Sequence, residues 1–380
     1  MGLDKLPYVE RMFTADTLDA MCRLRDAFDD SRRANPGKVV PVRACREWHG
    51  SSPRRDPQQP GNTEHAERAR GNTDTATPFE RDVADTIAIA RAAGRCVYVA
   101  GTGTRVSEAP RGADVIHVRR HGGVVEYVPG DLTITVNAGM SIAELDAITA
   151  EHGQWCPLFA WGRDASTIGG ALASGARGPA ARAFGSARDL ALGVRFVDGR
   201  GAVVAAGGRV VKNVAGFDLT RLMIGSWGTL GVITAASLRL RALPRANETL
   251  AVNVAEAGAS RLDAFARGPL APAARVRVDA SLAAELGLTA EPHEIVWLAG
   301  GTAEIEAART ALRALGPVRG LPADAWALLR ARGPFDACES NIEQSAALAR
   351  LNERVRRAFD PDAVFAAGAA IGAEAAMAHV

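Results

Sequence analysis

The sequence predicts an α+β fold with a larger and a smaller domain, and three observations support this prediction. The chain has 380 residues, enough for two domains of unequal size. Between residues 77 and 243, amphipathic helical stretches alternate with short runs of strand character. From residue 244 to residue 345 the sequence is rich in alanine, and helix-like stretches flank a strand-like segment at 295–298. We expect a larger domain over 77–243 and a smaller α+β domain over 244–345.

Composition excludes several classes of protein. The 45 basic and 43 acidic side chains give a formal net charge of +2, without the basic stripe and interleaved aromatic residues of a nucleic-acid-binding protein. No apolar run approaches the roughly 20 residues that span a bilayer, and the first residues lack the apolar core of a secretory signal. The five cysteines form no CxxC pair, which argues for a reducing compartment and against a zinc site or iron–sulfur cluster. A cytoplasmic protein is expected.

The first 76 residues divide into two segments. Within residues 1–45 one set of side chains recurs at helical spacing, namely Leu18, Met21, Cys22, Leu24, Arg25 and Phe28. Residues 46–76 are rich in Ser, Pro, Gly, Asn, Thr and charge, so apolar burial cannot offset the entropy of ordering them. We therefore predict a helical tail over 1–45 and a flexible linker over 46–76.

The larger domain starts at a helix signal. Thr77 is a capping residue, Pro78 occupies the first helical position and Glu80 the third, which together form a capping box. Gly94 ends this helix, and a strand over 96–99 leads directly into the turn 101–105, Gly-Thr-Gly-Thr-Arg. Successive N–H groups in such a turn can cradle an anion. A plain loop explains the same residues equally well.

Local signals place the remaining elements. Strands are expected over 115–118, 124–128 and 132–136, and Ser141 with Glu144 caps a second helix. A hairpin over 193–205 turns at Asp198-Gly199. Further helices are expected near 219–223, 260–266, 303–315 and 346–359, the last stopped by Asp360-Pro361. Residues 346–380 form a C-terminal helical segment.

Glycine is concentrated in one part of the chain. Of the 39 glycines, 24 fall between Gly94 and Gly231. The stretch 210–233 places a short helix before a glycine-lined turn and a strand, an arrangement that brings bare backbone against a flat or anionic ligand. An ordinary tight turn is the alternative explanation. The order of this stretch and the other glycine-rich segments is more specific than any one of them.

Five segments together resemble the FAD-binding domain of the vanillyl-alcohol oxidase and p-cresol methylhydroxylase superfamily. They are 101–104 (GTGT), 166–170 (STIGG), 184–189 (FGSARD), 211–218 (VKNVAGFD) and 228–233 (GTLGVI). The segment 212–218 is most similar to the E subunit of bacterial glycolate oxidase. The first 45 residues resemble the C-terminal tail of the D subunit of the same enzyme. A short echo, LRDAFD at 24–29 and VRRAFD at 355–360, accompanies this second resemblance.

The resemblance implies a PCMH-type FAD-binding domain, built from two α/β subdomains, over residues 77–243. It also implies a smaller α+β substrate-like domain and a C-terminal helix that returns to the FAD domain. Covalent members carry His or Cys in the first glycine loop, where Thr104 and Arg105 stand here, so FAD is expected to bind non-covalently.

The same resemblance implies which residues bind the cofactor. The pyrophosphate would lie on the backbone N–H groups of Gly101, Thr102, Gly103, Thr104 and Arg105. The flavin and its ribityl chain would be lined by a second set, Ser166, Thr167, Gly169, Gly170 and Ser174, and Gly185 is added to the cofactor-binding residues. The backbone of a third set, Gly228, Gly231, Val232 and Ile233, would approach the adenosine and the isoalloxazine edge.

Partners and substrate are also implied by the resemblance. In the family, the E subunit works with a D-type FAD subunit and an iron–sulfur F-type subunit on a small 2-hydroxy acid. The cytoplasmic protein would then associate with the inner membrane through this complex. The N-terminal tail would be a remnant of a fused D-type subunit, expected to pack loosely, although an ordinary amphipathic helix is the alternative.

No catalytic residue can be assigned. Catalytic members of the superfamily carry a metal motif, His-x-Gly-Asp-Gly-Asn-x-x-His, which this chain lacks. Its seven histidines are scattered, and four of them are interpreted as surface residues rather than ligands: His117, His121, His152 and His293. No metal site is expected.

Two other functions stay open. One is a self-sufficient flavin dehydrogenase of another alcohol or hydroxy acid, with a substrate carboxylate bound by a basic residue from the set Arg105, Arg177, Arg182 and Lys212. The other is a degenerate structural subunit that holds no flavin.

Overall fold

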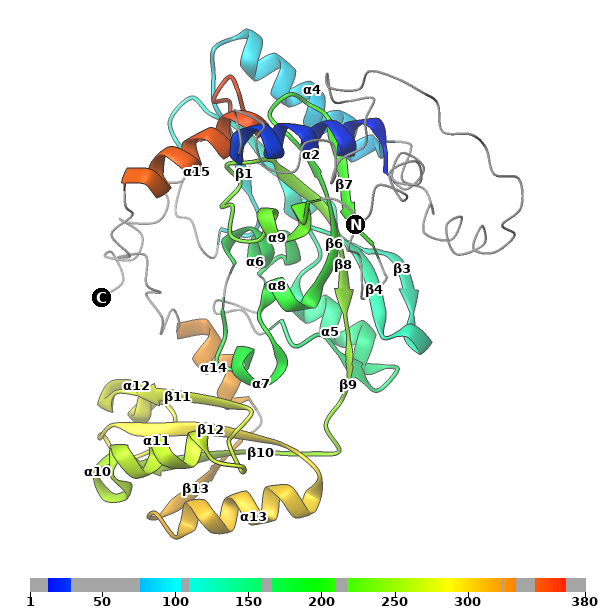
Figure 1. Cartoon of the computed structure of the whole chain (residues 1–380). Coiled ribbons are helices and arrows are strands. Elements are labelled where there is room, and N and C mark those ends of the chain that lie inside the picture. The colour runs from blue at the N-terminus through cyan, green and yellow to red at the C-terminus, as the bar shows by residue number, and fades with distance from the viewer. Residues whose placement is uncertain are drawn as a thin grey trace.

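The computed structural model describes residues 13–28, 76–103, 109–158, 166–175, 177–208, 217–322, 324–332 and 346–366. Figure 1 shows two bodies joined by the strand pair β9 and β10, with the N-terminal and C-terminal helices both lying against the larger body. The predicted linker, apart from Ala76, lies outside the described residues. So do the segment 209–216 and the last residues, 367–380.

The larger body is built on a five-stranded antiparallel sheet with the strand order β3-β4-β8-β6-β7. Its strands are β3 (Val124–Val128), β4 (Thr133–Asn137), β6 (Ala191–Val197), β7 (Val203–Gly207) and β8 (Val232–Arg239). The central strand β8 is buried along most of its length, as expected for a strand covered on both faces. The predicted strands over 124–128 and 132–136 and the predicted hairpin over 193–205 are confirmed, each within one or two residues.

A second subdomain holds α4 (Pro78–Ala92) and the parallel pair β1 (Val97–Ala100) and β2 (Asp114–His117). The predicted capping box is present, because the Thr77 hydroxyl accepts from the Glu80 N–H and the Glu80 carboxylate accepts from the Thr77 N–H. The second predicted cap, Ser141 with Glu144, starts α5 (Ile142–Ala150) in the same way. Short 3₁₀ turns η3 (Val118–Arg120) and η4 (Pro129–Asp131) follow β2 and β3.

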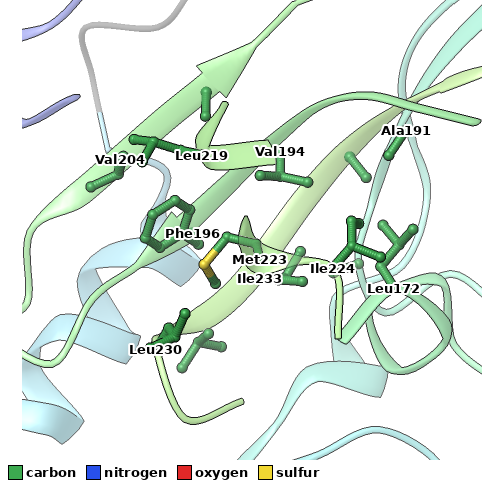
Figure 2. Packing of buried hydrophobic residues seen from close by; sticks show 14 of the residues in the cluster. Leu172, Ala191, Val194, Phe196, Val204, Leu219, Met223, Ile224, Leu230 and Ile233 are labelled. Atoms are coloured by element: carbon green, nitrogen blue, oxygen red, sulfur yellow. The ribbon is translucent and has the colours of Figure 1, made fainter. Parts of the chain in front are cut away.

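Short helices cover the sheet between its strands. They are α6 (Ile168–Ser174), α7 (Ala181–Phe184), α8 (Ala187–Leu190) and α9 (Leu219–Met223), and the last has the predicted bounds. Figure 2 shows Leu219 and Met223 of α9 among Val194, Phe196 and Val204 of β6 and β7. All five side chains are buried. This packing holds the end of α9, and therefore the turn that follows it, against the sheet.

The smaller body is a four-stranded antiparallel sheet with the order β11-β12-β10-β13. Its strands are β10 (Ala246–Asn253), β11 (Ala274–Val278), β12 (His293–Gly300) and β13 (Val318–Leu321), and the pair β5 (Gln154–Trp155) and β9 (Arg241–Ala242) precedes it. One face packs on α10 (Val254–Ala257), α11 (Ala259–Arg267) and α13 (Thr302–Arg313). The other packs on α12 (Ala280–Glu285) and α14 (Ala325–Arg332).

The last described helix, α15 (Ala346–Phe359), returns to the larger body as expected. Phe359 is fully buried, and its carbonyl oxygen accepts from the N–H of Gly199. The buried Asp360 carboxylate then accepts from the N–H groups of Val364 and Phe365, and Val97 of β1 donates to the Val364 carbonyl. The C-terminal segment thereby adds to the edge of β1.

The N-terminal helix α2 (Ala15–Phe28) lies beside α15 in Figure 1 and contacts the edge strand β7. The expectation that this tail packs loosely is wrong. Ala20, Met21 and Leu24 are at most 4% exposed, because they face the core of the larger body. Phe28 was expected on the same face, yet it is 55% exposed at the end of the helix.

Two polar side chains of α2 complete its docking. The Thr17 hydroxyl donates to the Ala205 carbonyl (2.9 Å) and accepts from the Ala205 N–H (3.1 Å), so one side chain satisfies both edge groups of β7. Arg23 pairs at 2.8 Å with the fully buried carboxylate of Asp198 and donates to the Ala358 carbonyl. Its guanidinium also lies 5.5 Å from the centre of the Phe359 ring. The tail is thus an integral part of the described fold.

Replacement of Thr17 by valine is expected to lower the free energy of unfolding by about 1–3 kcal/mol. Valine keeps the volume of threonine but leaves the N–H and carbonyl of Ala205 without their partner. Urea unfolding of the full chain measures this change. Thr310→Val, at an exposed position of α13, is the matched control and should stay within about 0.5 kcal/mol of wild type. Equal effects of the two substitutions would contradict the docking role of Thr17.

Candidate functional site

A cleft in the larger body is lined by backbone and small side chains. It holds about 670 Å³ of empty space, part of it open to solvent, and lies where β1, α6 and the start of β8 meet. Its lining residues are Val99, Gly101, Thr102, Gly103, Val118, Thr167, Gly169, Gly170, Ala173, Ser174, Trp227, Gly228, Gly231 and Ile233. No side chain in this set ionises near neutral pH. The cleft is therefore suited to binding rather than to acid–base chemistry.

The first wall is the turn that follows β1. In the described part of the chain, the N–H groups of Gly101, Thr102 and Gly103 donate no hydrogen bond, and Gly103 has a φ of 72°. Unpaired N–H groups at the end of a strand form a concave, electropositive surface that suits phosphate oxygens. The turn also lies against Thr167, because a Cβ at position 101 would come 2.6 Å from the Thr167 Oγ1. Glycine is required here by close packing.

The second wall is the start of α6. Its first N–H groups are already used: Ile168 donates to Met140, Gly169 donates to Ala138, and Gly170 donates to the Thr167 hydroxyl. This helix end therefore offers a close backbone surface rather than free donors. The fit is tight, because a Cβ on Gly169 would lie 2.9 Å from the Ala138 Cβ. The anion cradle of the cleft is thus the turn 101–103.

The third wall is the turn between α9 and β8. The N–H of Gly225 donates to the Leu172 carbonyl (3.1 Å) and that of Trp227 donates to the Ala173 carbonyl (2.8 Å), which ties the turn to the end of α6. Gly228 has a φ of 75°, and its Cα faces Val99 of β1. Behind this turn, Figure 2 shows Leu230 and Ile233 directed into the packed core.

Most of the predicted cofactor residues that the structure describes converge on this cleft. Ten line it: Gly101, Thr102, Gly103, Thr167, Gly169, Gly170, Ser174, Gly228, Gly231 and Ile233. Ser166 and Val232 are buried behind the walls, and Gly185 packs on Asp189 outside the lining. Thr104 and Arg105 lie outside the described residues, as does Lys212.

Four lining residues are absent from the sequence-based prediction: Val99, Val118, Ala173 and Trp227. Val99 directly precedes the predicted strand end, and Trp227 directly precedes the predicted Gly228. Their adjacency to predicted residues is a signal that could have identified them. Val118 and Ala173 carry no such signal, because only the packing of η3 and α6 brings them to the cleft.

FAD fits the groups that the cleft presents. Its diphosphate needs backbone N–H donors at close range, which the turn 101–103 supplies without competing partners. Its two ring systems need apolar walls that admit close approach, which Val99, Trp227 and Ile233 provide beside bare glycine backbone. No charged group inside the described lining would have to be buried by an incoming ring system.

The histidines give one correction. His293 was expected at the surface but is buried, with its Nδ1 2.7 Å from the Glu291 carbonyl oxygen. Its position at the start of β12, between β10 and β11, buries it. His121 stacks on Phe79 at 3.5 Å between ring centres, and burial lowers its pKa. Among the described residues no three His, Cys, Asp or Glu side chains come together as a metal site.

The two bodies touch through aromatic side chains. Phe184 of α7 and Trp155 of β5 lie 5.9 Å and 5.6 Å from Trp297 of the second sheet, measured between ring centres. Arg241 lies over the Phe184 ring at 5.8 Å. These contacts connect the smaller sheet to the larger body. None of the described helices is both long enough and apolar enough to span a bilayer.

Comparison with known families confirms the resemblance read from the motifs. Residues 79–207 match the family of FAD binding domains, and residues 1–39 match the C-terminal domain of FAD linked oxidases. The first match covers two walls of the cleft, the turn 101–103 and the start of α6. The second places at the N-terminus of this chain a sequence type that is named for the C-terminal domain of its family.

Individual relatives agree with these matches. Glycolate oxidase subunit GlcE of Escherichia coli is 41% identical over 143 residues, which are 37% of this chain and 41% of that protein. Glycolate oxidase subunit GlcD of Bacillus subtilis is 34% identical over 127 residues, 33% of this chain and 27% of that protein. The chain therefore spans less than half of these relatives.

A solved structure shows the same fold. The crystal structure of p-cresol methylhydroxylase with substrate bound superposes with a TM-score of 0.54 at 14% identity, covering 67% of this chain and 60% of that one. This likeness concerns the fold alone. Residues 79–207 are an FAD-binding domain, and the chain has the PCMH-type architecture.

Proposed function

We propose, starting from this FAD-binding domain, that the chain is the FAD-binding subunit of a glycolate-oxidase-type dehydrogenase of 2-hydroxy acids. The observation that carries the proposal is the cleft itself, where three segments far apart in the sequence present bare backbone around unpaired N–H groups. The local identity to GlcE supports the choice of subunit.

Within this proposal the roles of the chain's residues follow from their chemistry. The turn 101–103 would hold the diphosphate, and the apolar walls would hold the rings. When bound, FAD accepts two electrons from an oxidised substrate and passes them on. Removing the proton of a hydroxy acid needs a base, and none of the described lining residues can act as one. The bond-breaking step would therefore belong to a partner.

The partners would be a D-type FAD subunit and an iron–sulfur F-type subunit. The N-terminal match to an FAD linked oxidase C-terminal domain supports a close relation to the D-type chain. In this complex the subunit would work in the cytoplasm and reach the inner membrane through its partners. Its FAD would be non-covalent.

The visible spectrum of the purified full chain tests the proposal. We expect flavin absorption bands, release of intact FAD on denaturation, and poor dye reduction with glycolate until the partner subunits are added. Rapid glycolate- or lactate-dependent dye reduction by the chain alone would favour a self-sufficient dehydrogenase. Absence of flavin bands even after addition of FAD would leave only a structural subunit.

A further inference from the structure

Trp227 has an unfavourable backbone conformation. Its φ is 52°, and only two other non-glycine residues of the described chain, Leu132 and Ala363, have a positive φ. A bulky residue in this region is disfavoured by contact of its Cβ with the backbone. Such a conformation persists only where surrounding structure imposes it, and it is often found at functional sites.

The surrounding structure does impose it. The N–H of Trp227 donates to Ala173 at the end of α6, and the N–H of Gly225 donates to Leu172 one residue earlier. On the other side, the Thr229 N–H and hydroxyl both donate to the Ser226 carbonyl, at 3.0 and 2.7 Å. The turn is therefore fixed at both ends, and the direction of the indole is fixed with it.

This fixed direction places the indole in the cleft. Trp227 lines the cleft together with Val99 and the turn 101–103, and it is 41% exposed. Most large apolar side chains of the described chain are covered, so an exposed indole in a cleft retains an apolar face for a ligand. The neighbouring residue Gly228 packs on Val99, at the end of β1 that leads into the anion cradle.

We propose that Trp227 is a cofactor-binding residue that stacks on a planar nitrogen heterocycle of FAD. The inference rests on the proposed FAD site. Both ring systems of FAD, adenine and isoalloxazine, are joined to the diphosphate that the turn 101–103 would hold, and each offers an aromatic face. Stacking of an aromatic side chain on a base is worth about 1–3 kcal/mol, which corresponds to a change in affinity of about 5-fold to 150-fold.

Trp227→Gly in the full chain is the informative variant. Glycine accepts the positive φ, so the thermal midpoint of the apoprotein should stay the same or rise, whereas the affinity for FAD should fall about 5-fold to 150-fold. Trp227→Phe keeps an aromatic face and should bind FAD within about 3-fold of wild type. A merely structural tryptophan would lower the thermal midpoint in the glycine variant and leave the affinity for FAD unchanged.

Titrations with ADP and with FMN distinguish the two rings. A loss of affinity shared by ADP assigns the stack to adenine, and a loss shared by FMN assigns it to the isoalloxazine. Either pattern supports the inference. Normal binding of FAD by both wild type and Trp227→Gly would overturn this inference alone, whereas failure of the wild-type chain to bind FAD would overturn the proposed function as well.

Discussion

Replacement of Glu80 by alanine is expected to lower the free energy of unfolding by about 3–5 kcal/mol. The side chain is 1% exposed, and its carboxylate pairs with Arg195 through two hydrogen bonds of 2.8 and 2.9 Å. It also accepts from the Thr234 hydroxyl and the Thr77 N–H. Alanine would remove the helix cap and leave the largely covered guanidinium of Arg195 without its counter-charge. Urea unfolding of the full chain measures the loss.

Asp85→Ala is the matched control for this prediction. Asp85 lies on the same helix but is exposed, so its replacement should change stability by no more than about 0.5 kcal/mol. The double variant Glu80→Ala with Arg195→Ala should lose less than the sum of the two single losses, because each partner is costly mainly when left alone. Additive losses would show that the pair does not act as a unit.

The same carboxylate should make the fold sensitive to acid. Burial raises the pKa of Glu80, but the Arg195 guanidinium, the Thr77 N–H and the Thr234 hydroxyl together lower it below its ordinary value of 4.5. A carboxyl whose pKa is lowered by folding stabilises the fold above its unfolded pKa, and this contribution disappears as the pH falls through the folded pKa. Glu80→Gln should therefore flatten the fall in stability below about pH 4.5. An unchanged slope would contradict the assignment.

Gly101→Ala is expected to weaken FAD binding by about 10-fold to 150-fold, with a smaller effect on stability. The new Cβ would lie 2.6 Å from the Thr167 Oγ1, so the turn 101–103 must move away from α6. A shift that costs one hydrogen bond to a phosphate removes about 1.5–3 kcal/mol, and each 1.4 kcal/mol is tenfold in affinity. Titration of the apoprotein with FAD measures the change.

Two further variants test whether the clash is the cause. Gly130→Ala adds the same methyl group where nothing lies within 4 Å, and it should bind FAD as wild type does. Thr167→Ala removes the atom that the new Cβ meets, so the double variant Gly101→Ala with Thr167→Ala should recover part of the affinity. The single change Thr167→Ala should cost about 1 kcal/mol of stability through the lost helix cap. Wild-type affinity of Gly101→Ala would refute the close-packing argument.

Local signals determined much of this protein. The capping boxes at Thr77 and Ser141, the hairpin turn at Asp198 and the helix over 346–359 all appear where the sequence predicts them. These features depend on side chains within a few residues of each other, so a short window of sequence contains their cause. The order of the glycine-rich segments likewise predicts three walls of one cofactor site.

Tertiary structure decided what depends on distant partners. The tail around Thr17 and Arg23 is well packed because β7 and Asp198, nearly two hundred residues away, supply its partners. His293 is buried because neighbouring strands cover it, not because of its own sequence context. Gly101 needs glycine because Thr167 lies against it, and Trp227 enters the cleft because α6 fixes its turn. Such requirements arise only when remote segments meet, so the sequence alone determined the type of site and the folded chain determined its walls.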